Sequence, residues 1–361
     1  EQMERKRYNI CINIVSFSLY MFKSSGSFQS SFFGSFAYQG ILSRHEDHFL
    51  VRLVNAVDFT FVKDIAEQCY STLGRPAYNP VIMMKLLLLQ TLYDLSERDV
   101  VEQADTNILF RAFLGLSLDD EIPHWTLLGK FRERLGEQKF EEIFNQVVVL
   151  AKDIGLLDEK LRILDSTAVT AKVNVNRHVG PKGDENDTAS DRIQKRSPDK
   201  DASIGHKSVH KKWYGYKEHT SMDPSSDIVT AVITTSANVS DVTPSVDLID
   251  KERALFHHQK RPIRQVTADK AYVGRNKEFR KRNILDYTIP RDNMDPKTGT
   301  WYICAKRQRP KIERIFAEAK TNHHLGRCRY WTKWKTHVQG LLTFLTMNLK
   351  RLTNFLQPSM T

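Results

Sequence analysis

The hydrophobic pattern of this chain changes near residue 155, and that change most limits the folds open to it. From about His45 to Gly155, apolar residues recur every three to four positions, which is the period of helices. After it, alternating apolar and polar residues indicate strands, with further helical segments between them. A chain of 361 residues with 40% hydrophobic residues can bury real cores in both parts. The sequence thus predicts a helical region followed by an α/β region, and excludes a disordered, collagen-like or coiled-coil chain.

The charge balance favours an acidic partner. Lysine and arginine together number 54 against 43 acidic residues, which gives a formal net charge of +11. A surplus of this size is typical of proteins that bind a polyanion, and nucleic acid is the commonest one. Many basic proteins bind nothing acidic, however, so the charge alone leaves the partner open.

The four cysteines indicate a reducing compartment. They are too few and too scattered for a disulfide scaffold, so the expected location is the cytoplasm. Cys304 and Cys328 flank two adjacent histidines, but neither the CxxC nor the HxxxH spacing of a zinc site is present. A zinc site is therefore the weaker interpretation of these residues.

Residues 1–44 are predicted to form an N-terminal arm without a clear fold. A basic cluster precedes a mostly apolar run from Tyr8 to Phe22, which loosely resembles a signal peptide. Asparagines interrupt the run, no cleavage site follows, and its length is short for a membrane span. A vector remnant, an upstream translation extension and a loose strand all stay open.

Residues 45–155 are predicted to form a helical DNA-binding domain. Asn79 and Pro80 are a typical helix start, and the apolar run after them indicates a buried central helix. Ser96 and Asp99 have the spacing of a capping box. Short helices with basic side chains and tight polar turns favour a helix-turn-helix-like module, and a plain helical bundle is the alternative.

Residues 156–355 are predicted to form an α/β domain with a mixed five-stranded sheet. The expected strands are residues 161–165, 213–222, 228–236, 263–267 and 287–290. The second and third form a β-hairpin, and helices follow the third, fourth and fifth. This order is that of a ribonuclease H-like fold, which makes the whole chain α+β. The polar stretch 174–210 is expected to be a flexible insertion.

Three acidic residues occupy positions that this fold would bring together. Asp165 ends the first predicted strand, Asp269 follows the fourth, and Glu313 lies one turn inside a later helix. The first and fourth strands of such a sheet are adjacent and parallel, so both aspartates reach the same edge. On the later helix, Arg309, Glu313 and Lys320 form one stripe, because steps of four and seven residues return to nearly the same angle.

Carboxylates gathered at one point repel one another and need a compensating charge. Oxygen-rich clusters suit Mg²⁺ or Mn²⁺, and two such ions about 3.5–4 Å apart can activate an attacking oxygen and stabilise the leaving one at a phosphodiester. Asp165, Asp269 and Glu313 are therefore the predicted catalytic and metal-binding residues, with two ions per site. Arg309 and Lys320 are expected to hold the DNA backbone. A solvated surface position would explain any one acid alone, and the joint placement argues against it.

These residues resemble the signature of the DDE transposases of bacterial insertion sequences. The third acid of that family follows the pattern Tyr, two residues, Arg, three residues, Glu, six residues, Lys. Arg309, Glu313 and Lys320 match it, whereas Lys306 stands at the Tyr position. Further segments that resemble the family's blocks are residues 74–80, 95–98, 131–135, 164–167, 214–219 and 268–272. The resemblance extends from about residue 38 to residue 352.

The resemblance implies cut-and-paste transposition without a covalent protein–DNA intermediate. Metal-activated water would nick the terminal inverted repeats of the element, and the freed 3′-hydroxyl would attack target DNA. Pairing two ends implies a homodimer or larger assembly on DNA, at the bacterial nucleoid and away from any membrane. DNA contacts are also expected from Lys217, His219 and Lys270, although Lys270 could simply tune the charge beside Asp269.

Two other functions stay open on the sequence alone. A DNA-binding repressor or architectural protein derived from a transposase would bind ends without cutting them. A related ribonuclease H-like nuclease would cut without joining. The three retained acids argue against the first, and the stripe of Arg309, Glu313 and Lys320 argues against the second.

Overall fold

The N-terminal part of the chain folds into helices, as its hydrophobic period predicts. The computed structural model describes residues 32–71, 76–157, 160–179, 189–207, 212–256 and 263–357. The helices of this part are α2 (Phe32–Ser43), α3 (Phe49–Ala56), α4 (Thr60–Glu67), α5 (Pro80–Leu92), α6 (Glu97–Thr106), α7 (Ile108–Leu114) and α8 (Thr126–Asp153). Residues 32–43 of the predicted N-terminal arm form α2. Residues 1–31, which include the apolar run that resembles a signal peptide, lie outside the described residues.

Local sequence signals set the ends of these helices. The Asn79 side chain accepts a hydrogen bond from the Val81 N–H at 2.9 Å, and α5 is buried on nearly all sides. Ser96 and Asp99 form the predicted capping box at the start of α6. Helix α8 is interrupted at Gly136, whose φ of 65° is a left-handed conformation that glycine adopts without strain.

The C-terminal part is a mixed sheet flanked by helices. Its strands are β1 (Leu161–Thr170), β2 (Ser203–His206), β3 (Lys212–Met222), β4 (Val229–Ser236), β5 (Gln265–Ala268) and β6 (Leu285–Asp286). Its helices are α9 (Val175–Val179), α10 (Ala189–Arg196), α11 (Ser245–Leu255), the 3₁₀ turn η1 (Lys270–Tyr272), α12 (Asn276–Lys281), α13 (Thr300–Gln308), α14 (Lys311–Asn322) and α15 (Lys333–Leu356). The strand order is β2-β3-β1-β5-β6, and β4 also pairs with β3. β1 is antiparallel to β3 and parallel to β5, as a ribonuclease H-like sheet requires.

The sheet has six strands among the described residues rather than the five predicted. The additional strand, β2, pairs with the first residues of β3 and lies inside the stretch predicted to be a flexible insertion. That stretch also contains α9 and α10. The prediction was wrong here because the polar composition of residues 174–210 hid a strand of only four residues.

Two strand boundaries also differ from the prediction. β1 continues to Thr170, because it pairs with β3 along that whole length, so Asp165 lies within the strand and not at its end. β6 comprises Leu285–Asp286, before the predicted residues. The pairing with β5 nevertheless extends further, since Tyr287 N–H donates to Val266 O and Ile289 N–H donates to Ala268 O.

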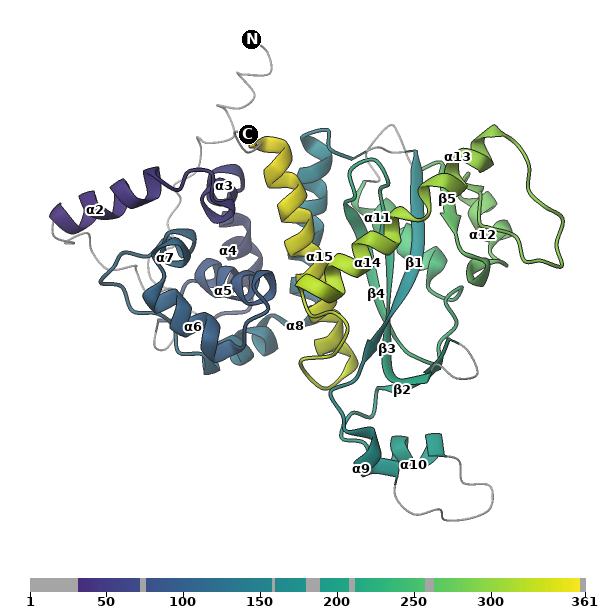
Figure 1. Cartoon of the computed structure of the whole chain (residues 1–361), viewed down its shortest axis with the longest axis horizontal. Helices are drawn as coiled ribbons and strands as arrows, with labels where there is room; N and C mark the ends of the chain where they lie inside the picture. The colour runs from purple at the N-terminus through teal and green to yellow at the C-terminus, as the bar shows by residue number, and fades with distance from the viewer. Residues whose placement is uncertain are drawn as a thin grey trace, which may run out of the picture.

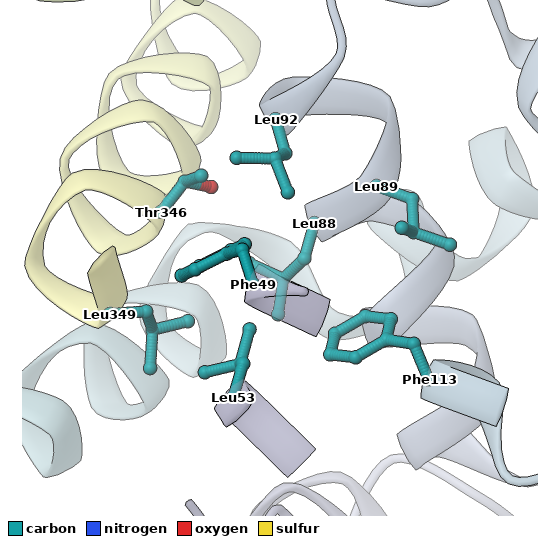
Figure 2. Close-up of a pocket in the computed structure, with 8 residues that line it drawn as sticks. All are labelled: Phe49, Leu53, Leu88, Leu89, Leu92, Phe113, Thr346 and Leu349. Atoms are coloured by element: carbon teal, nitrogen blue, oxygen red, sulfur yellow. The ribbon is translucent and has the colours of Figure 1, made fainter. Parts of the chain in front are cut away.

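Helix α15 joins the two parts of the molecule. It packs against α3, α5 and α8 on one side and against β4 on the other, so it lies between the helices and the sheet (Figure 1). Figure 2 shows the apolar junction of α3, α5, α7 and α15, which encloses a cavity of only about 10 Å³. The two parts therefore share one closely packed core. No helix in the described part of the chain is long and apolar enough to cross a membrane.

Candidate active site

The pairing of β1 with β5 places two of the predicted acids side by side. In this parallel pair Leu164 lies opposite Ala268, so the next residue of each segment is an aspartate. Asp165 is held between β3 and β5, whereas Asp269 comes just after β5 and caps η1, accepting a hydrogen bond from the Lys270 N–H at 2.6 Å. Strand register alone therefore brings the two carboxylates to one place.

The third acid reaches the same place from α14. The face of α14 formed by Ile312, Ile315, Phe316 and Ala319 is buried, as its spacing predicts, and the helix packs against β1. Glu313 lies beside that face in the first turn of the helix and is exposed. Packing of the apolar face thus fixes where Glu313 stands relative to β1 and leaves its carboxylate accessible.

The guanidinium of Arg309 contacts all three acids. Its Nη2 lies 3.3 Å from Asp165 Oδ2 and 3.5 Å from Asp269 Oδ2, and its Nη1 lies 2.8 Å from Glu313 Oε1. Arg309 precedes α14 by two residues, so the helix that carries Glu313 also positions the arginine. The three carboxylates, far apart in the sequence, therefore surround one positive charge.

Burial distinguishes Asp165 from the other two acids. Desolvation raises the pKa of Asp165 from 3.8 to about 6, while the Ser166 N–H and Arg309 act in the opposite direction. The negative charges of Asp269 and Asp241 raise the same pKa further. Asp165 is thus mostly a carboxylate at neutral pH and takes up a proton more readily than an exposed aspartate.

A fourth carboxylate, Asp241, stands at the edge of this site. Its Oδ1 accepts hydrogen bonds from Ser166 Oγ at 3.0 Å and from Lys217 Nζ at 2.8 Å. Asp241 follows β4 in a loop, and no motif in its sequence surroundings signals it. The nearest sequence clue is the hairpin itself, which returns the chain to the residue beside Asp165.

The donor set suits a hard divalent cation. Among the described residues, no three His, Cys, Asp or Glu side chains are close enough to share one ion in the present arrangement. The three acids are spread around Arg309 instead, which supplies the charge compensation they need. The side chains of Asp269 and Glu313 are accessible to solvent, at 45% and 60% exposed. Carboxylate oxygens on two adjacent segments and a helix are a donor set that fits Mg²⁺ or Mn²⁺.

The other predicted DNA-binding residues have different surroundings. Lys320 is exposed near the far end of α14, and Lys270 Nζ lies 2.5 Å from Asp292. Lys217 is mostly buried and paired with Asp241. His219 is fully buried, with Nε2 2.8 Å from Thr235 Oγ1, so it has no surface to offer DNA. The physical reason is that β3 is a central strand, covered by α11 and α15.

Acids on two adjacent segments and a flanking helix of a ribonuclease H-like sheet are the arrangement that the sequence predicts for phosphodiester chemistry. Residues 157–349 match the family described as Transposase DDE domain. Residues 40–134 match the family described as Transposase domain (DUF772). The chain belongs to the DDE transposases, and it is a catalytic, DNA-acting protein of that family.

Proposed function

We propose that this transposase binds the ends of an insertion sequence, cuts them and joins them to target DNA, using Asp165, Asp269 and Glu313. The observation that carries the proposal is the convergence of these three carboxylates on Arg309. A cluster of that charge and accessibility has no evident structural purpose, since two of its acids are exposed to solvent. It is well suited to bind two divalent cations, Mg²⁺ or Mn²⁺.

The chain's own residues prepare this chemistry. The bound ions would supply charge that activates the attacking oxygen and stabilises the leaving oxygen. Asp165, Asp269 and Glu313 would hold them, and burial of Asp165 excludes water from one side of the site. Arg309 presents a planar guanidinium next to the acids, and this group matches a phosphate oxygen pair as well as a carboxylate. We assign Arg309 the role of holding the DNA backbone once cations neutralise the acids.

DNA would extend from the acids along α14. Lys320 is two turns beyond Glu313 on this helix, and Lys270 stands directly beside Asp269. Both would contact backbone phosphates. The helical part, residues 45–155, would recognise the element ends, and two copies of the chain or more would pair them. Lys217 would not contact DNA directly. It would instead neutralise the charge of Asp241 at the edge of the site.

The test is an end-cleavage assay with Mg²⁺ or Mn²⁺. The end sequence is first found by footprinting the protein on DNA that flanks its own gene. Asp165→Ala, Asp269→Ala and Glu313→Ala are expected to bind this DNA and to leave it uncut. Asp295→Ala, which removes an exposed acid elsewhere in the same part of the chain, is the control and is expected to cut normally.

The outcomes separate the three functions. If the three variants cut as well as the wild type, the assignment of these acids is wrong. Metal-independent end binding without cleavage by the wild type would support a repressor or architectural protein instead. Cleavage without joining in a strand-transfer assay would support a nuclease.

A further inference from the structure

A polar pocket lies where the helical part meets the loop between α14 and α15. Its volume is about 660 Å³, and both parts of the molecule contribute to its wall. Arg98 and Trp125 come from the helical part, while Lys172, Arg327 and Tyr330 come from the sheet part and the loop. A space of this size on the surface is large enough to admit a segment of a polymer.

The pocket wall holds one carboxylate, Glu97, which is paired with Arg132, and three further cations. Arg98, Lys172 and Arg327 are all exposed, and none forms an ion pair with a carboxylate in the described part of the chain. The neighbouring Arg329 differs, because it pairs with Asp94 and donates to the Leu95 carbonyl at 2.9 Å. Arg329 thus fastens the loop to the helical part, and the other three cations remain available for a ligand.

The aromatic rings of the pocket serve to position arginines. The Arg98 guanidinium carbon lies 4.6 Å from the centre of the Trp125 ring, and that of Arg132 lies 4.3 Å from the centre of the Tyr330 ring. One face of each ring is therefore already covered by a cation. This arrangement favours an anionic phosphate over a stacked base as the ligand.

The pocket is connected to the active site by β1. Thr170, at the end of β1, donates its N–H to Gly326 O at 3.0 Å and accepts from Cys328 N–H at 2.8 Å, so the loop is attached to the strand. Thr170 is five residues beyond Asp165, which is roughly 17 Å at about 3.3 Å per strand residue. That length is about five nucleotide steps of DNA.

We propose that this pocket binds backbone phosphates of the DNA about five base pairs from the phosphodiester held at the three acids. Arg98 would reach the DNA from the helical part, and Lys172 and Arg327 from the catalytic part. The DNA would then be gripped jointly by both parts at the point where they meet. This inference rests on the proposed function, because it takes the acids as the position of the reacting phosphodiester.

The experiment measures how binding of a short duplex, carrying the footprinted end, depends on salt. The double variant Lys172→Ala/Arg327→Ala is compared with Lys277→Ala/Arg280→Ala, which removes the same charge from exposed positions on α12. The pocket variant is expected to lower the slope of log K against log salt by about two and to weaken binding by about tenfold or more. The α12 variant is expected to change neither by a comparable amount. Lys172→Arg/Arg327→Lys, which keeps the charge, should bind like the wild type.

Position along the DNA is tested with neutral methylphosphonate linkages. A neutral linkage about five base pairs from the cut should weaken binding by the wild type and leave the pocket variant unaffected. Equal affinity and salt slope in the pocket and α12 variants would overturn the proposal. A loss caused by abasic substitution rather than by the neutral linkage would also overturn it, in favour of a base-binding pocket.

Failure of this inference is distinguishable from failure of the proposed function. If the wild type cuts DNA and the pocket variant binds like the α12 variant, only the pocket assignment fails. If the three acids prove dispensable for cleavage while the pocket variant still loses affinity, the pocket binds DNA and its distance from the reaction must be redefined.

Discussion

Two arginines in this molecule each contact a set of carboxylates, and their surroundings differ sharply. The side chain of Arg162 is 2% exposed, and its partners Glu252 and Asp223 are 0% and 1% exposed. The side chain of Arg309 is 19% exposed, and those of its three acidic partners are 15%, 45% and 60% exposed. The arginine–carboxylate contacts of Arg162 are therefore closed to solvent, whereas those of Arg309 are open to it.

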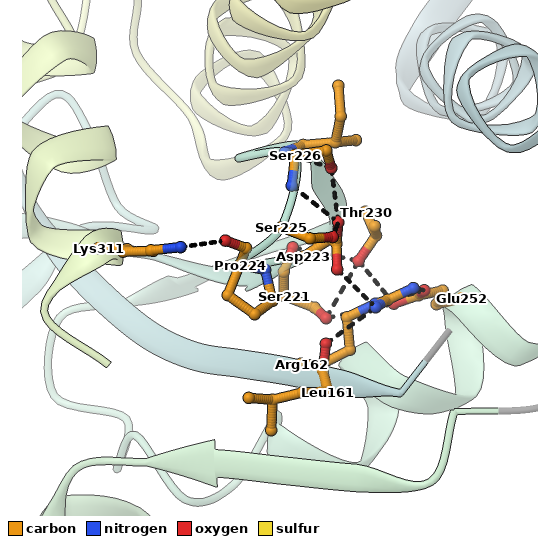
Figure 3. Close-up of polar contacts among 11 residues, drawn as sticks. Leu161, Arg162, Ser221, Asp223, Pro224, Ser225, Ser226, Thr230, Glu252 and Lys311 are labelled. Atoms are coloured by element: carbon orange, nitrogen blue, oxygen red, sulfur yellow. Dashed lines mark hydrogen bonds and ion pairs between the residues drawn. The ribbon is translucent and has the colours of Figure 1, made fainter. Parts of the chain in front are cut away.

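The Arg162 cluster satisfies its own charges (Figure 3). Arg162 Nε donates to Glu252 Oε1 at 2.7 Å, and Thr230 donates to the other carboxylate oxygen at 2.6 Å. Asp223 accepts from the hydroxyl groups of Ser225 and Ser226 in the hairpin turn. These contacts tie β1, α11 and the β3–β4 turn together, and we interpret the cluster as structural.

The Arg309 cluster has no such closure. Two of its three acids face solvent, and the Nε of Arg309 is buried without a hydrogen-bond partner among the described residues. An open carboxylate set can exchange one cation for another, whereas a sealed set cannot. Both clusters contain ion pairs, so the ion pairs alone do not tell them apart. The solvent exposure of the carboxylates distinguishes a candidate active site from a structural cluster.

Removing a charge from the open cluster should produce the largest effect, and it should be on catalysis. Asp165→Asn is expected to reduce end cleavage by on the order of 10³-fold or more. It should not lower the free energy of unfolding at pH 7, because the raised pKa of Asp165 means that its charged form is unfavourable in the folded protein. Cleavage rates and urea unfolding measure the two quantities. If Asp165→Asn cuts normally and has a lower free energy of unfolding, the Arg309 cluster is structural, like the Arg162 cluster.

Removing the cation from the sealed cluster should instead affect stability. Arg162→Met leaves two buried carboxylates without their partner, which should cost about 3–5 kcal/mol in urea unfolding. Cleavage per folded molecule should be retained. If the variant keeps wild-type stability and loses cleavage, the cluster is part of the chemistry and the comparison fails.

A third cation, Lys85, sharpens the comparison because it is buried and pairs with no carboxylate among the described residues. It lies 5.2 Å from the centres of the Phe59 and Phe113 rings, and burial lowers its pKa from 10.5 to about 8. The folded state thus binds this proton more weakly than the unfolded state, so the lysine costs stability below pH 8. Lys85→Met should raise the free energy of unfolding at pH 7 by up to about 3 kcal/mol. The gain should shrink as the pH rises from about 8 to 10.5, and a pH-independent gain would contradict this explanation.

The smallest effect is expected where the two clusters connect. Lys311 Nζ donates to the Pro224 carbonyl at 2.6 Å, which attaches the first turn of α14 to the hairpin turn of the sealed cluster (Figure 3). Lys311→Met should lower cleavage by up to roughly tenfold, through misplacement of Glu313, with little change in stability. Arg280→Met, which removes an exposed cation from α12, is the control and should cut normally. Equal activity of both variants with the wild type would show that α14 needs no such attachment.

Features with a local signal could be predicted from the sequence. The Asn79 cap, the Ser96–Asp99 capping box and the buried face of α14 each follow from residues within one or two turns. The neighbourhood of the three acids was also predictable, because strand order brings β1 beside β5. Their roles in catalysis and metal binding remain predictions, as does the division of the chain into its domains.

Features that depend on distant pairing could not be predicted. The extension of β1 past Asp165 is determined by β3, which pairs with it along that length. Asp241 reaches the site only because β4 returns the chain there, and the burial of His219 depends on helices that cover both faces of β3. The contact of Arg309 with all three acids likewise required the packed position of α14.

Binding of Mn²⁺ in the absence of DNA, followed by electron paramagnetic resonance, tests the central claim most directly. The wild type and Arg162→Met should both take up Mn²⁺, because the sealed cluster plays no part in binding. The double variant Asp165→Asn/Asp269→Asn should bind no Mn²⁺, so its spectrum should be that of the free ion. Uptake by this double variant equal to that of the wild type would show that the cation binds elsewhere and that the acids around Arg309 are not its site.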